Sequence, residues 1–462
     1  MDTILHGYEV NAPTWFYLSL LLILAVFFRF QRIWSLRNLD LVLLLLLSPG
    51  LLIVQATGVA SPIGYVWLFV VSGILWLRML CDPMWIRRPR LDPNLNSAGL
   101  AFLMASAFAF QVANILTRDP HANTMAAVQQ ADRLLKGESG QPVAMHEARD
   151  KPTAVPGPAS SLLVSPVLPL TGGVYELAAR WLAVLAHLSV TAGLIVLGRL
   201  HYRDWNQGLA MATLYLLLPC TAYDVSRVTH LLPAALILWA VVLSHSSLAA
   251  GLLLGLACGS LFFPWFLVPI WAAYYYRRRA LLKFSLALSS VAAILVLTLW
   301  LSAQDGPTLQ RQLLGSIDWS ALKFAGGNGQ GFWSLYDAAY RMPVFTLFTI
   351  ILVMQTIWPL EKHPEHLLAQ SATTVIATQF WYPHEGGVYI LWYLPLVIAV
   401  VFRPRWRHNG SETNSALSHV STTVSSFSPE RSTAIVSFEQ ARWSSSLRIP
   451  QLAEPHRREH VP

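Results

Sequence analysis

Charged residues are scarce in this sequence. Only 12% of its 462 residues are Asp, Glu, Lys or Arg, whereas soluble domains carry about 25%. This scarcity excludes an ordinary soluble domain. Cysteine is rare as well: Cys81, Cys220 and Cys258 stand at unrelated spacings, so the sequence predicts neither a disulfide framework nor a cysteine metal site. No basic residue precedes the first apolar run, which argues against a cleaved secretory signal.

Long apolar runs fill most of the chain, in which 55% of residues are hydrophobic. A run such as FYLSLLLILAVFF is close to the roughly 20 residues that a helix needs to cross hydrocarbon. The sequence therefore predicts an all-α fold, a polytopic transmembrane helix bundle with about 13 crossings. We expect spans near 14–30, 39–56, 63–80, 98–116, 178–199, 207–222, 228–244, 248–260, 261–276, 281–302, 343–359, 366–382 and 386–403.

The basic residues indicate how these spans are oriented. The net charge is +8, and most arginines cluster beside the ends of apolar runs, which is typical of cytoplasmic loops and of attraction to anionic lipid rather than of nucleic-acid binding. A break at Phe263-Pro264 keeps Arg277 to Arg279 on the cytoplasmic side with the other clusters. We therefore expect a multi-pass protein of the bacterial inner (plasma) membrane, with its N-terminus outside and its C-terminus in the cytoplasm.

Four regions follow from this topology. Residues 1–116 form an N-terminal four-span transmembrane region, and residues 117–177 form a large extracytoplasmic loop after the fourth span. Residues 178–403 form the transmembrane core. Residues 404–462 are rich in Ser and Thr and lack apolar periodicity, so they are predicted to be a disordered cytoplasmic tail.

The large loop holds the first candidate site. Asp119 and His121 follow the fourth span by only a few residues, so the bundle fixes their position. A carboxylate there suits a general base toward a hydroxyl, or a ligand that holds a divalent metal against a phosphate. The next segment, 122–136, has apolar residues at helical spacing and is predicted to be an amphipathic helix.

Three further outer turns supply candidate substrate-binding residues. Asp224 and Arg227 share a short turn, where they either pair with each other or let Arg227 contact an anionic head group. Arg341 ends a glycine-rich outer loop. His384 and Glu385 lie in a tight turn before the last span and face either water or the site.

Several segments, in their order along the chain, resemble the GT-C superfamily of integral-membrane glycosyltransferases, most closely its polyprenol-phosphomannose-dependent mannosyltransferases. The resemblance covers roughly residues 98–403. The segments that carry it are AAVQQADRLLKGE and SLLVSPVLPL in the large loop, AAGLLLGLACGSLFFPWFLVPIWAAYYYRRR, GNGQGFWSLYDAAYR, and PHEGGVYILWYLP. The chain departs from the family pattern at Asn123, where the family has its catalytic aspartate, and at Phe262, where a lysine is common.

The resemblance implies a hexosyltransferase that moves a sugar from a polyprenyl-phosphate donor to a glycan or lipid acceptor on the outer side of the membrane. Under it, Asp119 takes the place of the missing aspartate, with or without a divalent metal. Arg227 and Arg341 stabilise the departing phosphate, and His384 orients a substrate. The alternative is a non-catalytic membrane protein of the same fold, either a lipid-binding scaffold or a transporter, which accounts directly for Asn123 and Phe262.

Overall fold

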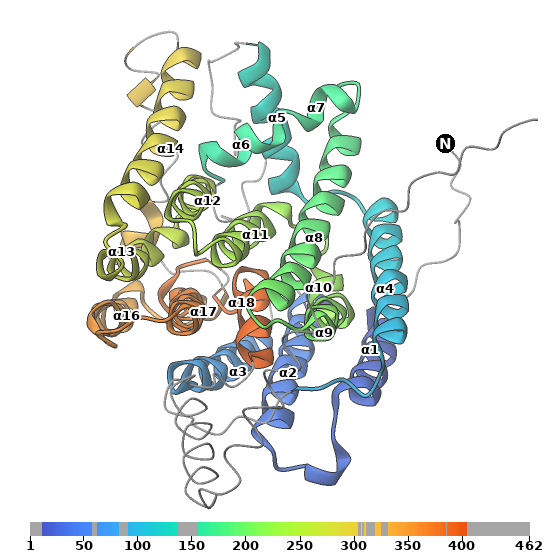
Figure 1. Ribbon diagram of the computed structural model, residues 1–462. Coiled ribbons are helices and arrows are strands. Elements are labelled where there is room, and N and C mark those ends of the chain that lie inside the picture. Colours follow the sequence, from blue (N-terminus) through green and yellow to red (C-terminus); the bar gives the residue numbers. More distant parts are fainter. Residues whose placement is uncertain are drawn as a thin grey trace, which may run out of the picture. The chain divides into compact units, whose positions relative to one another are not determined.

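The computed structural model describes residues 12–57, 62–82, 91–136, 156–303, 306, 309–310, 319–324, 331–384 and 386–403. Within these ranges every regular element is a helix (Figure 1), so the predicted all-α fold is confirmed there. The chain divides into two units, Met1–Pro404 and Arg405–Pro462. The second unit, with the predicted tail, lies outside the described residues.

Six helical segments are long and apolar enough to cross a membrane, which fits the predicted membrane protein. They are α2 (Leu36–Thr57), α3 (Pro62–Leu80), α4 (Ser97–Thr117), α8 (Tyr175–Leu200), α14 (Leu281–Ser302) and the segment Ala338–Ile357, which contains η7 (Ala338–Tyr340) and α16 (Arg341–Ile357). The count of 13 crossings and the sidedness of the loops stay predictions.

The other predicted spans correspond to helices that fall short of these criteria of length or hydropathy. They are α1 (Ala12–Phe27), α9 (Trp205–Leu217), α11 (Val228–Val242), α12 (Ser247–Ser260), α13 (Val268–Arg277), α17 (Pro364–Trp381) and α18 (Ile390–Phe402). Short elements connect them: η1 (Phe30–Arg32), α10 (Pro219–Tyr223), η5 (Trp319–Leu322) and η6 (Gly331–Leu335).

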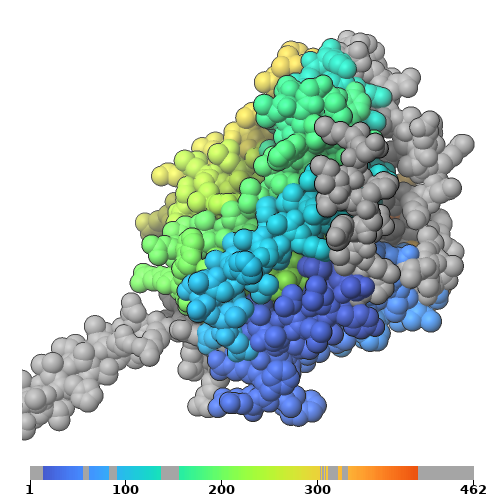
Figure 2. Space-filling model, turned by 90° about the vertical axis from the view of Figure 1, so that its right-hand side faces the viewer, coloured from blue at the N-terminus to red at the C-terminus, as the bar shows by residue number. Residues whose placement is uncertain are grey.

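The helix α18 lies at the centre of the described bundle. It contacts α2, α8, α9, α11 and α17, and Figure 1 shows it between these helices. Nearly all of its residues are buried, as expected for a helix that is apolar on every side. Figure 2 shows α1 and α4, in blue and cyan, on one face of the bundle, where Trp15 and Phe110 stack with ring centroids 4.0 Å apart.

The predicted break at Phe263-Pro264 is present. Helix α12 ends at Ser260, Leu261 is extended with φ −147° and ψ 167°, and η4 (Phe263–Leu267) leads into α13 (Val268–Arg277). Proline explains the break, since it cannot donate a helical hydrogen bond. Helix α12 packs closely on α14 at Gly251, which has no side chain. A Cβ at this position would lie only 2.6 Å from the carbonyl oxygen of Phe284.

The described part of the large loop forms three helices: α5 (Ala122–Lys136), α6 (Pro158–Val164) and α7 (Val167–Leu170). The predicted amphipathic helix is therefore confirmed as α5, and it packs against α6, α8 and α11. Helix α6 docks on the end of α12, where the amide of Gly157 donates to the carbonyl of Ser260 at 2.8 Å. Residues 137–155 lie outside the described residues.

Candidate functional site

Two of the predicted site residues, His121 and Arg227, lie within electrostatic reach of each other. Burial, together with the Arg227 guanidinium, lowers the pKa of His121 to about 4. His230, the imidazole three residues after Arg227 in the same candidate segment, lies within reach of both. We call His121, Arg227 and His230 the imidazole cluster. Its members come from three places: the segment after α4, the turn before α11, and the first turn of α11.

Hydrogen bonds to the end of α10 and to the turn after it bring these segments together. The guanidinium of Arg118 donates to the carbonyls of Ala222 at 3.2 Å and Tyr223 at 3.4 Å. The hydroxyl of Thr124 donates to the carbonyl of Ser226 at 3.0 Å. The chain that leaves α4 is therefore fastened on both sides of His121 to the turn that carries Arg227.

Asp224 and Arg227 form an ion pair in which Nε and Oδ1 are 3.3 Å apart. The side chain of Asp224 is 5% exposed and that of Arg227 is 23% exposed. The sequence left two interpretations of this turn, an ion pair within it or contact of Arg227 with an anionic head group. The structure shows the ion pair. The pair holds the guanidinium in the turn from which it acts on both imidazoles.

Both imidazoles of the cluster use Nδ1 as an acceptor. The backbone amide of Asn123 donates to Nδ1 of His121 at 3.3 Å, and the indole of Trp392 donates to Nδ1 of His230 at 2.8 Å. A neutral imidazole whose Nδ1 accepts carries its proton on Nε2. Two imidazole N–H donors and one guanidinium thus belong to a single cluster.

An aromatic cluster, Phe262, Tyr382, Tyr389 and Trp392, adjoins His230. Tyr389 stacks on His230 with centroids 5.0 Å apart and on Trp392 at 4.2 Å. Phe262 stacks on Tyr382 at 4.6 Å. The predicted residue His384 joins through Tyr382, which it meets edge-on at 5.3 Å. Phe262, where the family that the sequence resembles commonly has lysine, therefore packs as an aromatic ring among other rings.

The remaining predicted residues lie differently. Asp119 is exposed on the surface beside Arg118. Arg341 is buried, and its guanidinium donates to the carbonyls of Trp381 at 2.8 Å, Lys323 at 3.0 Å and Ala321 at 2.7 Å. These contacts hold the segment before α16 against the end of α17. Glu385 lies outside the described residues.

The described residues contain no group of three or more His, Cys, Asp or Glu side chains that could hold a metal ion. The predicted divalent metal therefore has no complete protein ligand set among them. A further buried imidazole, His187 of α8, binds the same turn: its Nε2 lies 3.0 Å from the carbonyl of Val225, and the hydroxyl of Tyr215 lies 2.8 Å from its Nδ1. A lone histidine in an apolar run was the sequence signal for it.

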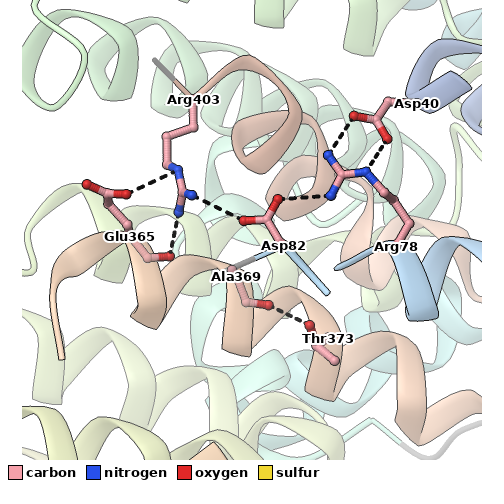
Figure 3. A network of polar contacts seen from close by, with 7 residues as sticks. All are labelled: Asp40, Arg78, Asp82, Glu365, Ala369, Thr373 and Arg403. Carbon is pink, nitrogen blue, oxygen red and sulfur yellow. Dashed lines mark hydrogen bonds and ion pairs between the residues drawn. The ribbon is translucent and has the colours of Figure 1, made fainter. Parts of the chain in front are cut away.

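A network of ion pairs lies at the other end of α18 (Figure 3). Arg78 makes a two-pronged contact with Asp40 at 2.7 and 2.9 Å and a single contact with Asp82 at 3.0 Å. Arg403 contacts Asp82 at 3.2 Å and Glu365 at 3.4 Å. These five residues connect α2, α3, α17 and the C-terminal end of α18. Three carboxylates face two guanidinium groups.

The network and the imidazole cluster are separated by the length of α18. Trp392 contacts His230 near the start of this helix, and Arg403 follows its last residue. Eleven residues at about 1.5 Å each place them roughly 16 Å apart along the axis. Ionisable groups within a membrane bundle are costly unless paired. The ion-pair network therefore holds helices together. The imidazole cluster, in contrast, contains several N–H groups that can donate hydrogen bonds.

The chain matches no protein-family model, no curated protein and no solved structure. Its membership of any family therefore stays a prediction, and the function has to be argued from the residues of the imidazole cluster.

Proposed function

We propose that this protein is a membrane glycosyltransferase of the GT-C type, which transfers a sugar from a polyprenyl-phosphate carrier to an acceptor on the outer side of the membrane. The observation that carries the proposal is the convergence of His121, Arg227 and His230 beside an aromatic cluster. A guanidinium within electrostatic reach of two imidazoles suits a phosphate group, and aromatic faces suit the apolar faces of a sugar or an isoprenoid chain.

The phosphate of the donor would contact Arg227 and the Nε2–H groups of the two histidines. Asp224 keeps the guanidinium in place through its 3.3 Å ion pair. A phosphate bound here adds negative charge beside His121, which favours the protonated imidazole and so strengthens binding as the pH falls. This arrangement stabilises the leaving phosphate as negative charge accumulates on it.

Asp119 supplies the general base in this proposal. The acceptor hydroxyl attacks the anomeric carbon, and a new carbon–oxygen bond forms as the bond between that carbon and the phosphate oxygen breaks. The hydroxyl proton passes to Asp119, and the electron pair of the broken bond leaves with the polyprenyl phosphate. Asp119 is exposed and adjacent to Arg118, which anchors the segment to Ala222 and Tyr223.

A second candidate function is supported by specific contacts. Asn123 stands where the related family has its aspartate, and Arg341 donates to three backbone carbonyls. Both fit a non-catalytic membrane protein, a lipid-binding scaffold or transporter, that binds a phosphorylated lipid in the imidazole cluster without transferring anything. The two candidates share the ligand chemistry and differ in turnover.

The test uses the full chain in lipid nanodiscs, with polyprenyl phosphate mannose labelled in the sugar and octyl mannoside as the acceptor. Binding and transfer are measured for wild type, Asp119→Asn, Arg227→Gln and Arg227→Lys. Asp132→Asn is the matched control, because Asp132 is an acid of the same loop that pairs with Lys136 at 2.6 Å and accepts from Tyr175 at 2.7 Å.

We expect Asp119→Asn to bind the donor but transfer at under about a hundredth of the wild-type rate, since general-base catalysis contributes about 10² or more. Arg227→Gln is expected to weaken binding, Arg227→Lys to restore part of it, and Asp132→Asn to change neither. Normal transfer by Asp119→Asn would remove Asp119 from the mechanism. Donor binding that depends on Arg227, with no transfer by any variant, would favour the non-catalytic candidate.

A further inference from the structure

The end of α13, the turn after it and the first turn of α14 carry four cationic residues: Arg277, Arg278, Arg279 and Lys283. All four are exposed, and Arg279 has a φ of +53°, so the chain reverses direction within very few residues. The turn thereby gathers three guanidinium groups at the start of α14, a helix long enough to span a membrane.

Carboxylates are missing around this turn. The sequence contains no Asp or Glu between Asp224 and Asp305. Among the described residues, no ion pair involves any of the four cations. Arg278 lies over the ring of Tyr274, with Cζ 4.3 Å from its centroid. In the described part of the chain, therefore, no Asp or Glu side chain forms an ion pair that neutralises the positive charge of these four residues.

Two of these cations, Arg277 and Arg279, border a hollow of about 650 Å³. Its lining combines positive, hydroxyl and apolar side chains, namely Tyr276, Arg277, Arg279, Leu281, Leu282 and Ser285. Tyr276 is 68% exposed and Leu282 is 72% exposed. One turn further along α14, Leu286 is also exposed. An apolar, exposed helix face that begins beside arginines and a tyrosine is typical of the depth where hydrocarbon meets lipid head groups.

We propose that this hollow binds the head group of an anionic membrane phospholipid. Arg277 and Arg279 take the phosphodiester, for which a guanidinium offers paired N–H donors. The hydroxyl of Ser285 donates to a second lipid oxygen, and the side chains of Tyr276 and Leu282 lie along the start of the acyl chains. This lipid site is separate from the imidazole cluster and holds whether or not the proposed transferase activity does.

The test measures lipid binding by the full detergent-solubilised chain in native mass spectrometry, with phosphatidylglycerol against phosphatidylcholine. The variants are Arg277→Gln/Arg279→Gln and Leu282→Glu, which adds a carboxylate to the hollow without removing a cation. The matched control is Arg199→Gln/Arg203→Gln, which removes two exposed arginines that do not line the hollow and have a carboxylate, Asp204, beside them.

A second readout is the thermal midpoint, followed with a thiol-reactive dye, because Cys220 and Cys258 are buried and react only on unfolding. Phosphatidylglycerol is expected to raise the midpoint of wild type. Each arginine near anionic lipid contributes about 1 kcal/mol, so the Arg277/Arg279 variant should bind about tenfold to thirtyfold more weakly. Leu282→Glu should weaken binding in the same direction, and the Arg199/Arg203 control should stay within about twofold of wild type.

Three results would overturn the proposal. One is equal binding of phosphatidylglycerol and phosphatidylcholine. Another is an equal loss in the Arg277/Arg279 variant and the Arg199/Arg203 control, which would make the attraction a diffuse effect of net charge. The third is displacement of the lipid by millimolar inorganic phosphate, which would identify free phosphate as the occupant. If the double arginine variant unfolds, Leu282→Glu decides the question alone, since it changes an exposed side chain.

Discussion

The indole N–H of Trp392 in α18 donates a 2.8 Å hydrogen bond to Nδ1 of His230 in α11, two residues that are 162 positions apart in the sequence. The bond sets the tautomer of the neutral His230 imidazole, and the backbone amide of Asn123 does the same for His121. His121 and His230, which lie far apart in the sequence, thus both carry their proton on Nε2, and both lie within electrostatic reach of Arg227.

Trp392→Phe removes the donor of this bond and keeps an aromatic ring in place. His230 and Trp392 are both buried, so Nδ1 of His230 is left without its indole partner away from water. We expect a loss of about 1–3 kcal/mol in stability, seen as a lower thermal midpoint and as weaker donor binding. Trp300→Phe, at an exposed position of α14, is the control and should change the midpoint little. Equal midpoints for the two variants would contradict the role of the bond.

Arg78→Met tests the ion-pair network. It leaves Asp40 without its two-pronged partner and removes one of two guanidinium contacts of Asp82, both carboxylates being buried. Such a loss is expected to cost about 3–5 kcal/mol. The control Lys136→Met breaks the exposed pair between Lys136 and Asp132, which should change stability little because solvent screens such a pair. The measurement is the denaturation midpoint of both variants in the same detergent. A similar decrease of the midpoint in both would show that the network stabilises the protein no more than a surface ion pair does.

Much of the helical framework was predictable, because apolar runs in a membrane have few alternatives to a helix. The break at Phe263-Pro264 followed from proline chemistry, and α5 followed from the spacing of Val128 and Ala131 with their neighbours. The number of crossings was less accessible. Helices such as α9 and α18 are short and buried, and sequence hydropathy does not separate a buried helix from one that faces lipid.

The site was predictable only in part. The turn with Asp224 and Arg227 stood out because ionisable groups are rare beside apolar runs. His230 lies three residues further on, but its importance depends on Trp392, which arrives from the last helix. The network of Asp40, Arg78 and Arg403 was missed for the same reason. Each residue alone resembles an ordinary charge at a helix end, and only tertiary contacts bring them together.

The stability of the protein should depend on His121 between about pH 6.5 and pH 4. Burial and Arg227 lower the pKa of His121 in the folded protein from 6.5 to about 4. In this window the unfolded chain takes up a proton that the folded protein does not, so stability falls as the pH falls and levels off below about pH 4. The full effect is at most about 3 kcal/mol, from about 1.4 kcal/mol per pKa unit.

The measurement for His121 is the thermal midpoint as a function of pH for wild type and His121→Gln. Carboxylates common to both proteins cancel in the difference between the two curves. That difference should be flat above about pH 7 and should move in favour of His121→Gln as the pH falls. Parallel curves across the window would show that His121 titrates as a solvated imidazole and lies apart from Arg227.

Gly157→Ala tests how the large loop is held on the bundle. A Cβ at Gly157 would lie 2.2 Å from the carbonyl oxygen of Gly259, so α6 must move away from α12 to accommodate it. Overpacking of this kind costs about 1–3 kcal/mol. Gly73→Ala in α3 is the matched control, because nothing lies within 4 Å of its added Cβ and alanine favours a helix by about 1 kcal/mol. We therefore expect a lower thermal midpoint for Gly157→Ala and an equal or higher one for Gly73→Ala. A Gly157→Ala protein as stable as wild type would mean that α6 does not depend on close contact with α12.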